Sequence, residues 1–171
     1  NLRRILGDPD AARPFLIVTP GTIQFDPESD YWLDLRDVER TAQTLPQVKP
    51  DPARIIAELE AVAAAYHGPF LEGFSLKDSA PFEEWALLKR EQIAQRMAIT
   101  LGRLAALHES RGDYEAAQRH SLRLVQLEPL DEESYRLAMR VLAAGGKRST
   151  ALALYDSCRR LLAEEFGVEP D

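Results

Sequence analysis

Apolar residues recur at helical spacing along most of the chain after Asp37. The longest such stretch runs from Pro81 to Arg111, with no strong helix break before Gly112. At 1.5 Å per residue, it predicts one helix roughly 45 Å long. One stripe along it comprises Phe82, Trp85, Leu88, Ile93, Met97, Leu101, Leu104 and His108, and a second comprises Ala94, Ala98 and Ala105. Because a helix that is apolar on two sides needs a neighbour on each, the pattern predicts a layered stack of helices.

Another helix is predicted ahead of this one. Asp51 is a suitable N-cap, Pro52 fits the first helical position, and the alanine-rich run to Ala65 has high helix propensity. The proline-rich segment 46–52 separates this helix from an earlier helical piece that begins at Asp37.

The segment 67–74 contains two glycines and a proline, so it is predicted to be a loop. Its residues Phe70, Leu71 and Phe74 are too apolar for a fully hydrated loop. The loop is therefore expected to pack into the core, as is Trp85, which shares a helix face with other apolar residues.

The first 35 residues differ from the rest, because they carry the only clear strand signals. Phe15–Val18 and Thr22–Phe25 are rich in β-branched and aromatic residues and flank the turn sequence Thr19-Pro20-Gly21. This combination predicts a hairpin in which Gly21 has a positive φ. A short helix that ends at Gly7 precedes the hairpin. Helix end, loop and hairpin follow one another in this order at the end of a winged helix.

An internal repeat is visible in the second half of the chain. The residues around Gly112 align with those around Gly146, and each glycine precedes a second helix after a short turn. Their separation equals the period of roughly 34 residues that is typical of tetratricopeptide repeats, whose helical hairpins stack to bury their apolar faces. The predicted contact positions are Leu101, Leu104, Ala105, Gly112, Ala117, Gly146, Ala151 and Tyr155. The alternative is an accidental pair of helical hairpins with no repeat.

Composition narrows the class of protein. With 45 % hydrophobic and 29 % charged residues, the 171-residue chain has the composition of a globular protein. Its net charge of −7 argues against a freestanding nucleic-acid binder. No apolar run approaches the roughly 20 residues that a membrane helix needs. A single cysteine, Cys158, fits a reducing cytoplasm, and the start at Asn1 suggests a fragment of a longer protein.

Few residues suggest chemistry. His67, His108 and His120 lack the local spacing of metal ligands, so neither a metal site, nor a catalytic site, nor a cofactor is predicted. Cys158 falls on an apolar helical stripe and is expected to be a buried packing thiol. Arg3 and Arg4 are the only basic pair at the predicted junction of helix and hairpin. They either lie near DNA or form a solvated helix end.

Four separated blocks resemble the bacterial transcriptional activator domain of the SARP-type antibiotic regulatory proteins. They are Tyr66–Phe74, Phe82–Trp85 with Arg90-Glu91, Leu127–Glu133, and Ala151–Tyr155 through Leu161–Pro170. The resemblance covers residues 36–171, while residues 1–35 resemble the end of the preceding winged-helix DNA-binding domain, with Arg3 and Arg4 at the end of its recognition helix. The resemblance implies a mainly α fold, in which a β-hairpin remnant precedes a tetratricopeptide-like α-solenoid.

The resemblance also implies a function. The protein is expected to be a cytoplasmic transcriptional activator that binds DNA through a complete winged helix, with no membrane contact. Its helical domain would mediate one of two contacts. It would bind a second copy of the protein, or it would bind the transcription machinery, such as RNA polymerase. The alternative is a generic tetratricopeptide adaptor that binds a peptide segment of a partner protein. An enzyme is a third class, for which the sequence offers no polar constellation.

Overall fold

The computed structural model describes residues 2–10, 12–33, 35 and 51–170. It divides into two compact units, Asn1–Leu33 and Asp34–Asp171. The helical piece predicted from Asp37 and most of the proline-rich break at 46–52 lie outside the described residues. Among the helices that are described, none combines the length and the apolar character needed to cross a bilayer.

The first unit contains a short helix and a two-stranded hairpin. Its elements are α1 (Leu2–Ile5), the 3-10 turn η1 (Asp8–Asp10), β1 (Leu16–Val18) and β2 (Ile23–Phe25). The strands are antiparallel, with Leu16 opposite Phe25 and Val18 opposite Ile23. Gly7, with a φ of 66°, lies directly after α1. The predicted short helix and hairpin are therefore present.

The turn between the strands differs from the prediction, because Gly21 does not take a positive φ. The two threonines on either side of the turn close it instead. The Thr19 amide donates to the Thr22 carbonyl at 2.9 Å, and the two hydroxyl oxygens lie 2.7 Å apart. With these bonds fixing the chain, the turn does not need the left-handed conformation that a glycine allows.

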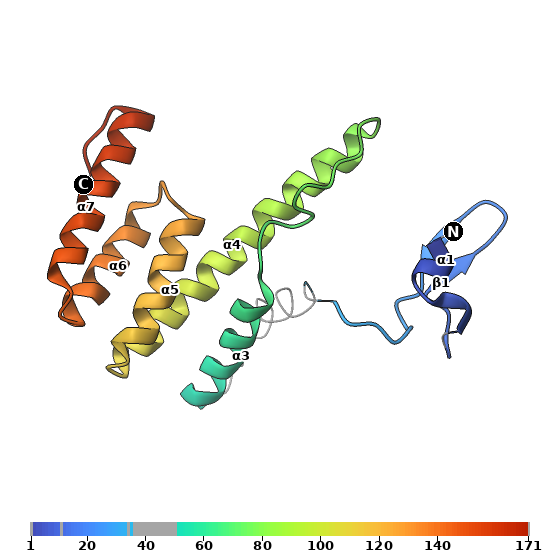
Figure 1. Ribbon diagram of the computed structural model, residues 1–171, viewed down its shortest axis with the longest axis horizontal. Coiled ribbons are helices and arrows are strands. Elements are labelled where there is room, and N and C mark those ends of the chain that lie inside the picture. Colours follow the sequence, from blue (N-terminus) through green and yellow to red (C-terminus); the bar gives the residue numbers. More distant parts are fainter. Residues whose placement is uncertain (1, 11, 34, 36–50, 171) are drawn as a thin grey trace. The chain divides into compact units, whose positions relative to one another are not determined.

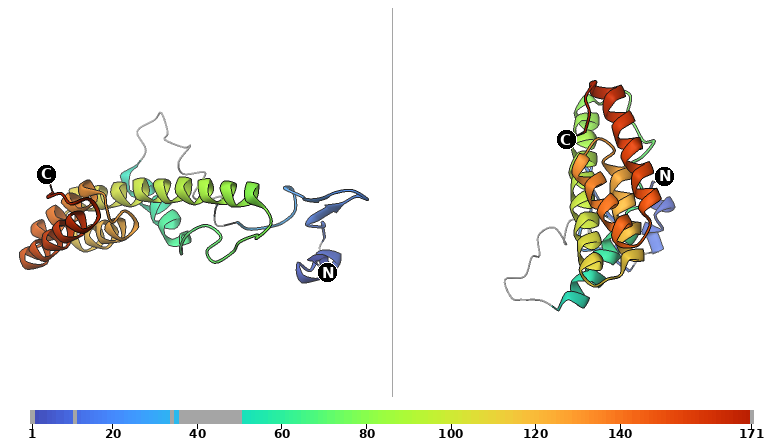
Figure 2. Two further views of the ribbon diagram at one scale, coloured as in Figure 1. Left: turned by 90° about the horizontal axis from the view of Figure 1, so that it is seen from above. Right: turned by 90° about the vertical axis from the view of Figure 1, so that its left-hand side faces the viewer.

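The second unit is a series of helices, each packed against the next. They are α3 (Pro52–Ala65), α4 (Ala80–Ser110), α5 (Tyr114–Leu127), α6 (Glu132–Ala144) and α7 (Arg148–Phe166). Figures 1 and 2 show that α4 to α7 lie side by side and alternate in direction. The predicted helix from Pro81 to Arg111 is observed as the unbroken α4, which has 31 residues. The mainly helical fold with an N-terminal hairpin is thus confirmed.

Aspartates begin three of these helices. The side chains of Asp51, Asp113 and Asp131 accept hydrogen bonds from amides in the first turns of α3, α5 and α6. A carboxylate at this position satisfies an otherwise unpaired amide and interacts favourably with the helix dipole. The predicted cap at Asp51 is therefore confirmed, and these three caps fix where the helices start.

The two turns that close the α4–α5 and α6–α7 hairpins have the same hydrogen bonds, one repeat period apart. The Asp113 amide donates to the His108 carbonyl at 3.0 Å, and the Lys147 amide donates to the Leu142 carbonyl at 2.8 Å. Gly112 and Gly146, which precede these amides, have φ values of 74° and 81°. Only glycine adopts this conformation without strain, so each turn requires its glycine.

Two apolar clusters form the core of the helical unit. The larger joins α3, α4 and α5 through Ile56, Leu59, Val62, Ala63, Ile93, Met97, Leu101, Leu104 and Leu124. The smaller joins α5, α6 and α7 through Val125, Tyr135, Ala138, Cys158 and Leu162. Because α5 contributes to both, its packing links the two halves of the series.

Ala151 tests this packing directly, because it is buried near the start of α7 while Ser149, in the same first turn, is exposed. We expect Ala151→Glu to destabilise the unit by roughly 3 kcal/mol or more, since it buries an unpaired charge. Ser149→Glu should change stability by less than about 0.5 kcal/mol. Urea denaturation followed by circular dichroism measures both, and equal losses would contradict the helix contact at Ala151.

Candidate functional site

Arg3 and Arg4, the basic pair predicted to lie near DNA, both lie on α1. The Arg3 guanidinium forms an ion pair with Asp8, whose side chain is buried, while Arg4 is exposed. Asp8 also accepts hydrogen bonds from the amides of Phe15 and Leu16, which lead into β1. Arg3 is therefore part of the contact that joins α1 to the hairpin, and Arg4 extends into solvent.

Asp8 is ionised in this arrangement. Desolvation by burial acts to raise its pKa, but the hydrogen bonds from Arg3 and from the Leu16 and Phe15 amides lower the pKa below its ordinary value. A carboxyl with a lowered pKa stabilises the folded state above its ordinary pKa, and this stabilisation is lost as the pH falls through the acid range. The contact between α1 and the hairpin is thus expected to weaken in acid.

The loop from 67 to 79 runs beside the N-terminal half of α4 (Figure 1). Arg90 of α4 fixes it there, because its guanidinium donates to the carbonyls of Phe70, Leu71 and Phe74 at 2.8, 3.1 and 3.3 Å. The Leu76 amide donates to the Glu83 carboxylate at 2.5 Å. The loop is therefore attached to the helix by its backbone.

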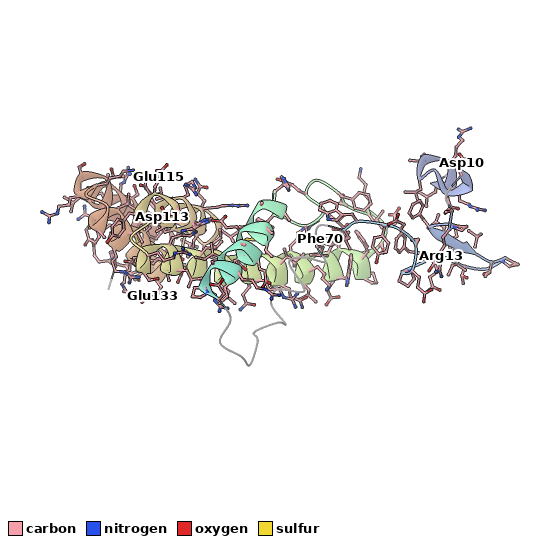
Figure 3. The ribbon with its side chains drawn as sticks, turned by 90° about the horizontal axis from the view of Figure 1, so that it is seen from below. Asp10, Arg13, Phe70, Asp113, Glu115 and Glu133 are labelled. Atoms are coloured by element: carbon pink, nitrogen blue, oxygen red, sulfur yellow. The ribbon has the colours of Figure 1, made fainter. Side chains whose placement is uncertain are left out.

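Four aromatic rings form a contiguous cluster between this loop and α4. Phe74 and Phe82 have centroids 5.8 Å apart, and Trp85 lies 5.6 Å from both Phe82 and Phe70. Figure 3 labels Phe70 in this region. The expectation that the loop and Trp85 belong to the core is only partly correct: Phe70 packs against the larger core cluster, but Phe74 and Trp85 are 48 % and 45 % exposed. The reason is that α3 and α5 pack on the C-terminal half of α4.

The same loop and the N-terminal half of α4 carry other exposed apolar side chains. On the loop they are Leu71 and Leu76, and on α4 Leu87 and Leu88. We call this set, together with Phe74 and Trp85, the loop–helix surface. Large apolar side chains that stay exposed in number on one part of a protein often mark a contact with another molecule. The loop–helix surface is therefore the candidate site for a protein partner.

The residues predicted as repeat contacts fall into three groups. Leu101, Leu104, Ala105 and Ala117 are fully buried, and Ala151 nearly so. Gly112 and Gly146 form the two hairpin turns described above. Tyr155 differs, because its side chain is 41 % exposed on α7 and lies at the edge of the packed face.

A polar cluster connects α3, α4 and α5 at one end of the hairpin. The Glu60 Oε1 atom lies 3.2 Å from Nε2 of His108 and 2.8 Å from Nε2 of His120. The other ring nitrogen of His108, Nδ1, lies 3.2 Å from the carboxylate of Asp113, which is labelled at the start of α5 in Figure 3. Both imidazoles are buried and stack with centroids 5.5 Å apart.

Protonation in this cluster follows from burial. Desolvation lowers the pKa of His120, although Glu60 partly opposes the shift, so the neutral imidazole is favoured. For Glu60, desolvation acts to raise the pKa, but the hydrogen bonds to His120 and His108 lower it overall. The cluster was missed from the sequence because its residues lie on three helices, and a search for local ligand spacing detects only ligands on one element.

One further prediction concerns Cys158, and an acidic run also has a structural role. Cys158 is buried in the smaller core cluster, and desolvation raises the pKa of its thiol. It is therefore a packing residue, as expected from its apolar stripe. The acidic run 131–133 lies at the start of α6, where Asp131 is the N-cap and the negative charge interacts favourably with the helix dipole.

Comparison with protein families adds an independent finding. The model of the bacterial transcriptional activator domain matches residues 33–171 of this chain, which is most of its length. A search of curated proteins found no significant match. The family to which four sequence blocks pointed is therefore confirmed over the helical unit.

Arg3 and Arg4 form a matched pair for testing the Asp8 contact. We expect Arg3→Ala to raise the pKa of Asp8 towards the ordinary value of about 3.9, because it removes a hydrogen bond and a positive charge. Arg4→Ala should leave the pKa of Asp8 unchanged. An NMR titration of the Asp8 carboxyl carbon measures both variants. The ion pair would be contradicted if the titration midpoint did not move in Arg3→Ala.

Proposed function

This chain belongs to the bacterial transcriptional activator domain family, and from that membership we propose that its helical unit makes the activating contact of a DNA-binding regulator. Members of the family act by binding and are not enzymes. The observation that carries the proposal is the loop–helix surface, where exposed aromatic and aliphatic side chains lie on α4 and on the loop attached to it. Such a surface suits a protein partner better than DNA, which requires positive charge.

The proposed architecture of residues 36–171 is a tetratricopeptide-like solenoid. The turn hydrogen bonds at Gly112 and Gly146 support this architecture, because they recur after one repeat period. Leu104 and Ala138 are separated by the same period, and both are fully buried. In such a repeat each hairpin buries its face on the next, so the stack presents a rigid, extended surface. The family match favours an activator over a generic tetratricopeptide adaptor.

Residues 1–35 are proposed to be the last part of a winged-helix DNA-binding domain. Among the described residues of this unit, the buried side chains are Asp8, Asp26 and Ser29, while apolar residues such as Ile5 and Ile23 are exposed. A unit that buries polar contacts and exposes its aliphatic residues needs further elements to complete a core. A winged helix would supply them, and the protein would then act in the cytoplasm, where its DNA is.

The partner at the loop–helix surface is proposed to be the transcription machinery, with RNA polymerase as its main component, or a second copy of the chain. Leu88 and Leu152 allow a controlled test, since both are exposed leucines, 52 % and 66 %, on α4 and α7 respectively. Leu88 belongs to the loop–helix surface and Leu152 does not.

We expect Leu88→Glu to lower activation of a reporter gene by tenfold or more, because a charge within an apolar contact costs about 2 kcal/mol. Leu152→Glu should leave activation unchanged, and both proteins should melt at the same temperature. Sedimentation equilibrium tests self-association: a dimer lost in Leu88→Glu identifies a second copy as the partner, and a chain that is monomeric with and without the change excludes it. Equal activation by the two variants would reject the surface.

Contact with DNA is tested in a chain that carries a complete winged helix. We expect Arg3 or Arg4 to lie near the phosphates, with the Thr19–Thr22 turn beside them. The double change Arg3→Ala, Arg4→Ala should weaken binding to all sequences and lower the salt slope by about one for each lost contact. Footprinting at several salt concentrations measures this, and unchanged footprints would exclude a DNA contact by Arg3 and Arg4.

Deletion of the residues after Asp37 tests the helical unit in the same chain. It should abolish activation of the reporter gene while some DNA affinity remains.

A further inference from the structure

The polar cluster of α3, α4 and α5 has the donor set of a metal site. Glu60, His108 and His120 each offer one ligand atom, and these atoms all lie within 4.8 Å of one another. In a tetrahedral Zn²⁺ site with bonds of about 2.0–2.1 Å, neighbouring donors are about 3.3 Å apart. The observed distances from Glu60 Oε1 to the two Nε2 atoms, 3.2 and 2.8 Å, are close to that value. Two of the three donor pairs therefore already have nearly tetrahedral spacing.

His108 is already oriented as a ligand. Its Nδ1 faces the Asp113 carboxylate at 3.2 Å, and its Nε2 faces Glu60 at 3.2 Å. Asp113 is itself fixed, because its other oxygen accepts from the Ala116 amide at 3.1 Å as the N-cap of α5. A carboxylate that accepts from the second nitrogen of a ligating histidine is the usual outer contact of a protein metal site.

The two nitrogens of His108 each face a carboxylate oxygen, Nδ1 that of Asp113 and Nε2 that of Glu60. A cation between Nε2 of His108 and Glu60 would bind to both of these atoms. The ion would also neutralise Glu60, which lies between two buried imidazoles.

Solvent access to the cluster and the chemistry of its donor atoms indicate which kind of ion it binds. The imidazoles of His108 and His120 are buried, but the Glu60 side chain is 38 % exposed, which gives an ion a route from solvent and leaves a position for water. Two imidazoles and one carboxylate suit Zn²⁺ and similar divalent transition ions, whereas Mg²⁺ and Ca²⁺ prefer oxygen ligands. We propose that Glu60, His108 and His120 bind one divalent transition-metal ion such as Zn²⁺. Asp113 is the carboxylate that contacts the second nitrogen of His108. The bound ion links α3 to the α4–α5 hairpin.

The test uses the whole 171-residue chain after removal of metals with a chelator. Zn²⁺ is titrated in competition with a chromophoric chelator, and Co²⁺ is added separately because its visible spectrum reports coordination geometry. We expect one ion per chain, a tetrahedral Co²⁺ spectrum, and a higher melting temperature with Zn²⁺. On Zn²⁺ addition, the ring ¹⁵N resonances of His108 and His120 should shift and those of His67 should not. The NMR readout needs no variant, so it does not depend on the folding of one.

Variants then locate the ion. For Asp113→Asn we expect roughly a 10- to 100-fold loss of Zn²⁺ affinity. Glu60→Gln keeps an oxygen acceptor for His120 but removes the negatively charged ligand. It should therefore weaken Zn²⁺ binding more than Asp113→Asn does. Asn at 113 still caps α5, which makes the change conservative. His67→Gln is the control, since that exposed ring bonds only to the nearby Ala65 carbonyl at 2.9 Å among the bonds described. Absence of binding, or binding that survives Glu60→Gln unchanged, would overturn the proposal and leave a hydrogen-bonded bridge.

Discussion

The packing of the helical unit depends on small side chains where neighbouring helices approach closely. Ala105, Ala117 and Ala138 are fully buried at these positions. The constraint is equally clear at the end of α6, where a Cβ on Gly145 would lie 3.2 Å from that of Tyr114 on α5. Larger residues would separate the helices and open voids in both core clusters. The other contacts between these helices depend on this close spacing.

Two arginines complete the fold by pairing with backbone groups that the helices leave open. Arg90 donates to three carbonyls of the 70–74 loop, and Arg123 of α5 donates to the carbonyls of Ala63 and Tyr66 at the end of α3. The Arg123 guanidinium also lies 5.8 Å from the centre of the Tyr66 ring. The bonds of Arg123 satisfy carbonyls at the end of α3 that would otherwise need water, and those of Arg90 satisfy carbonyls of the loop. They also place the loop on α4 so that the loop–helix surface forms.

The sequence was sufficient for features that depend on local interactions and insufficient for those that depend on distant ones. The Asp51 cap, the unbroken α4 and the hairpin turns at Gly112 and Gly146 follow from residues within a few positions of each other. The exposure of Trp85 could not be predicted, because an apolar stripe shows what a helix can bury and not which half has a neighbour. The Glu60 cluster was invisible for a related reason, since its partners are 48 and 60 residues away along the chain.

Cys158 gives the last two helices a chemical property that follows from their packing. It is the only cysteine in the sequence, and it is buried where α7 meets Val125 of α5 and Tyr135 of α6. An alkylating reagent reacts with the exposed thiolate, and burial both shields the sulfur and raises the pKa of the thiol. Its rate of labelling therefore reports how often α7 separates from the stack. The chain carries its own probe for the opening of that interface, with no engineered label.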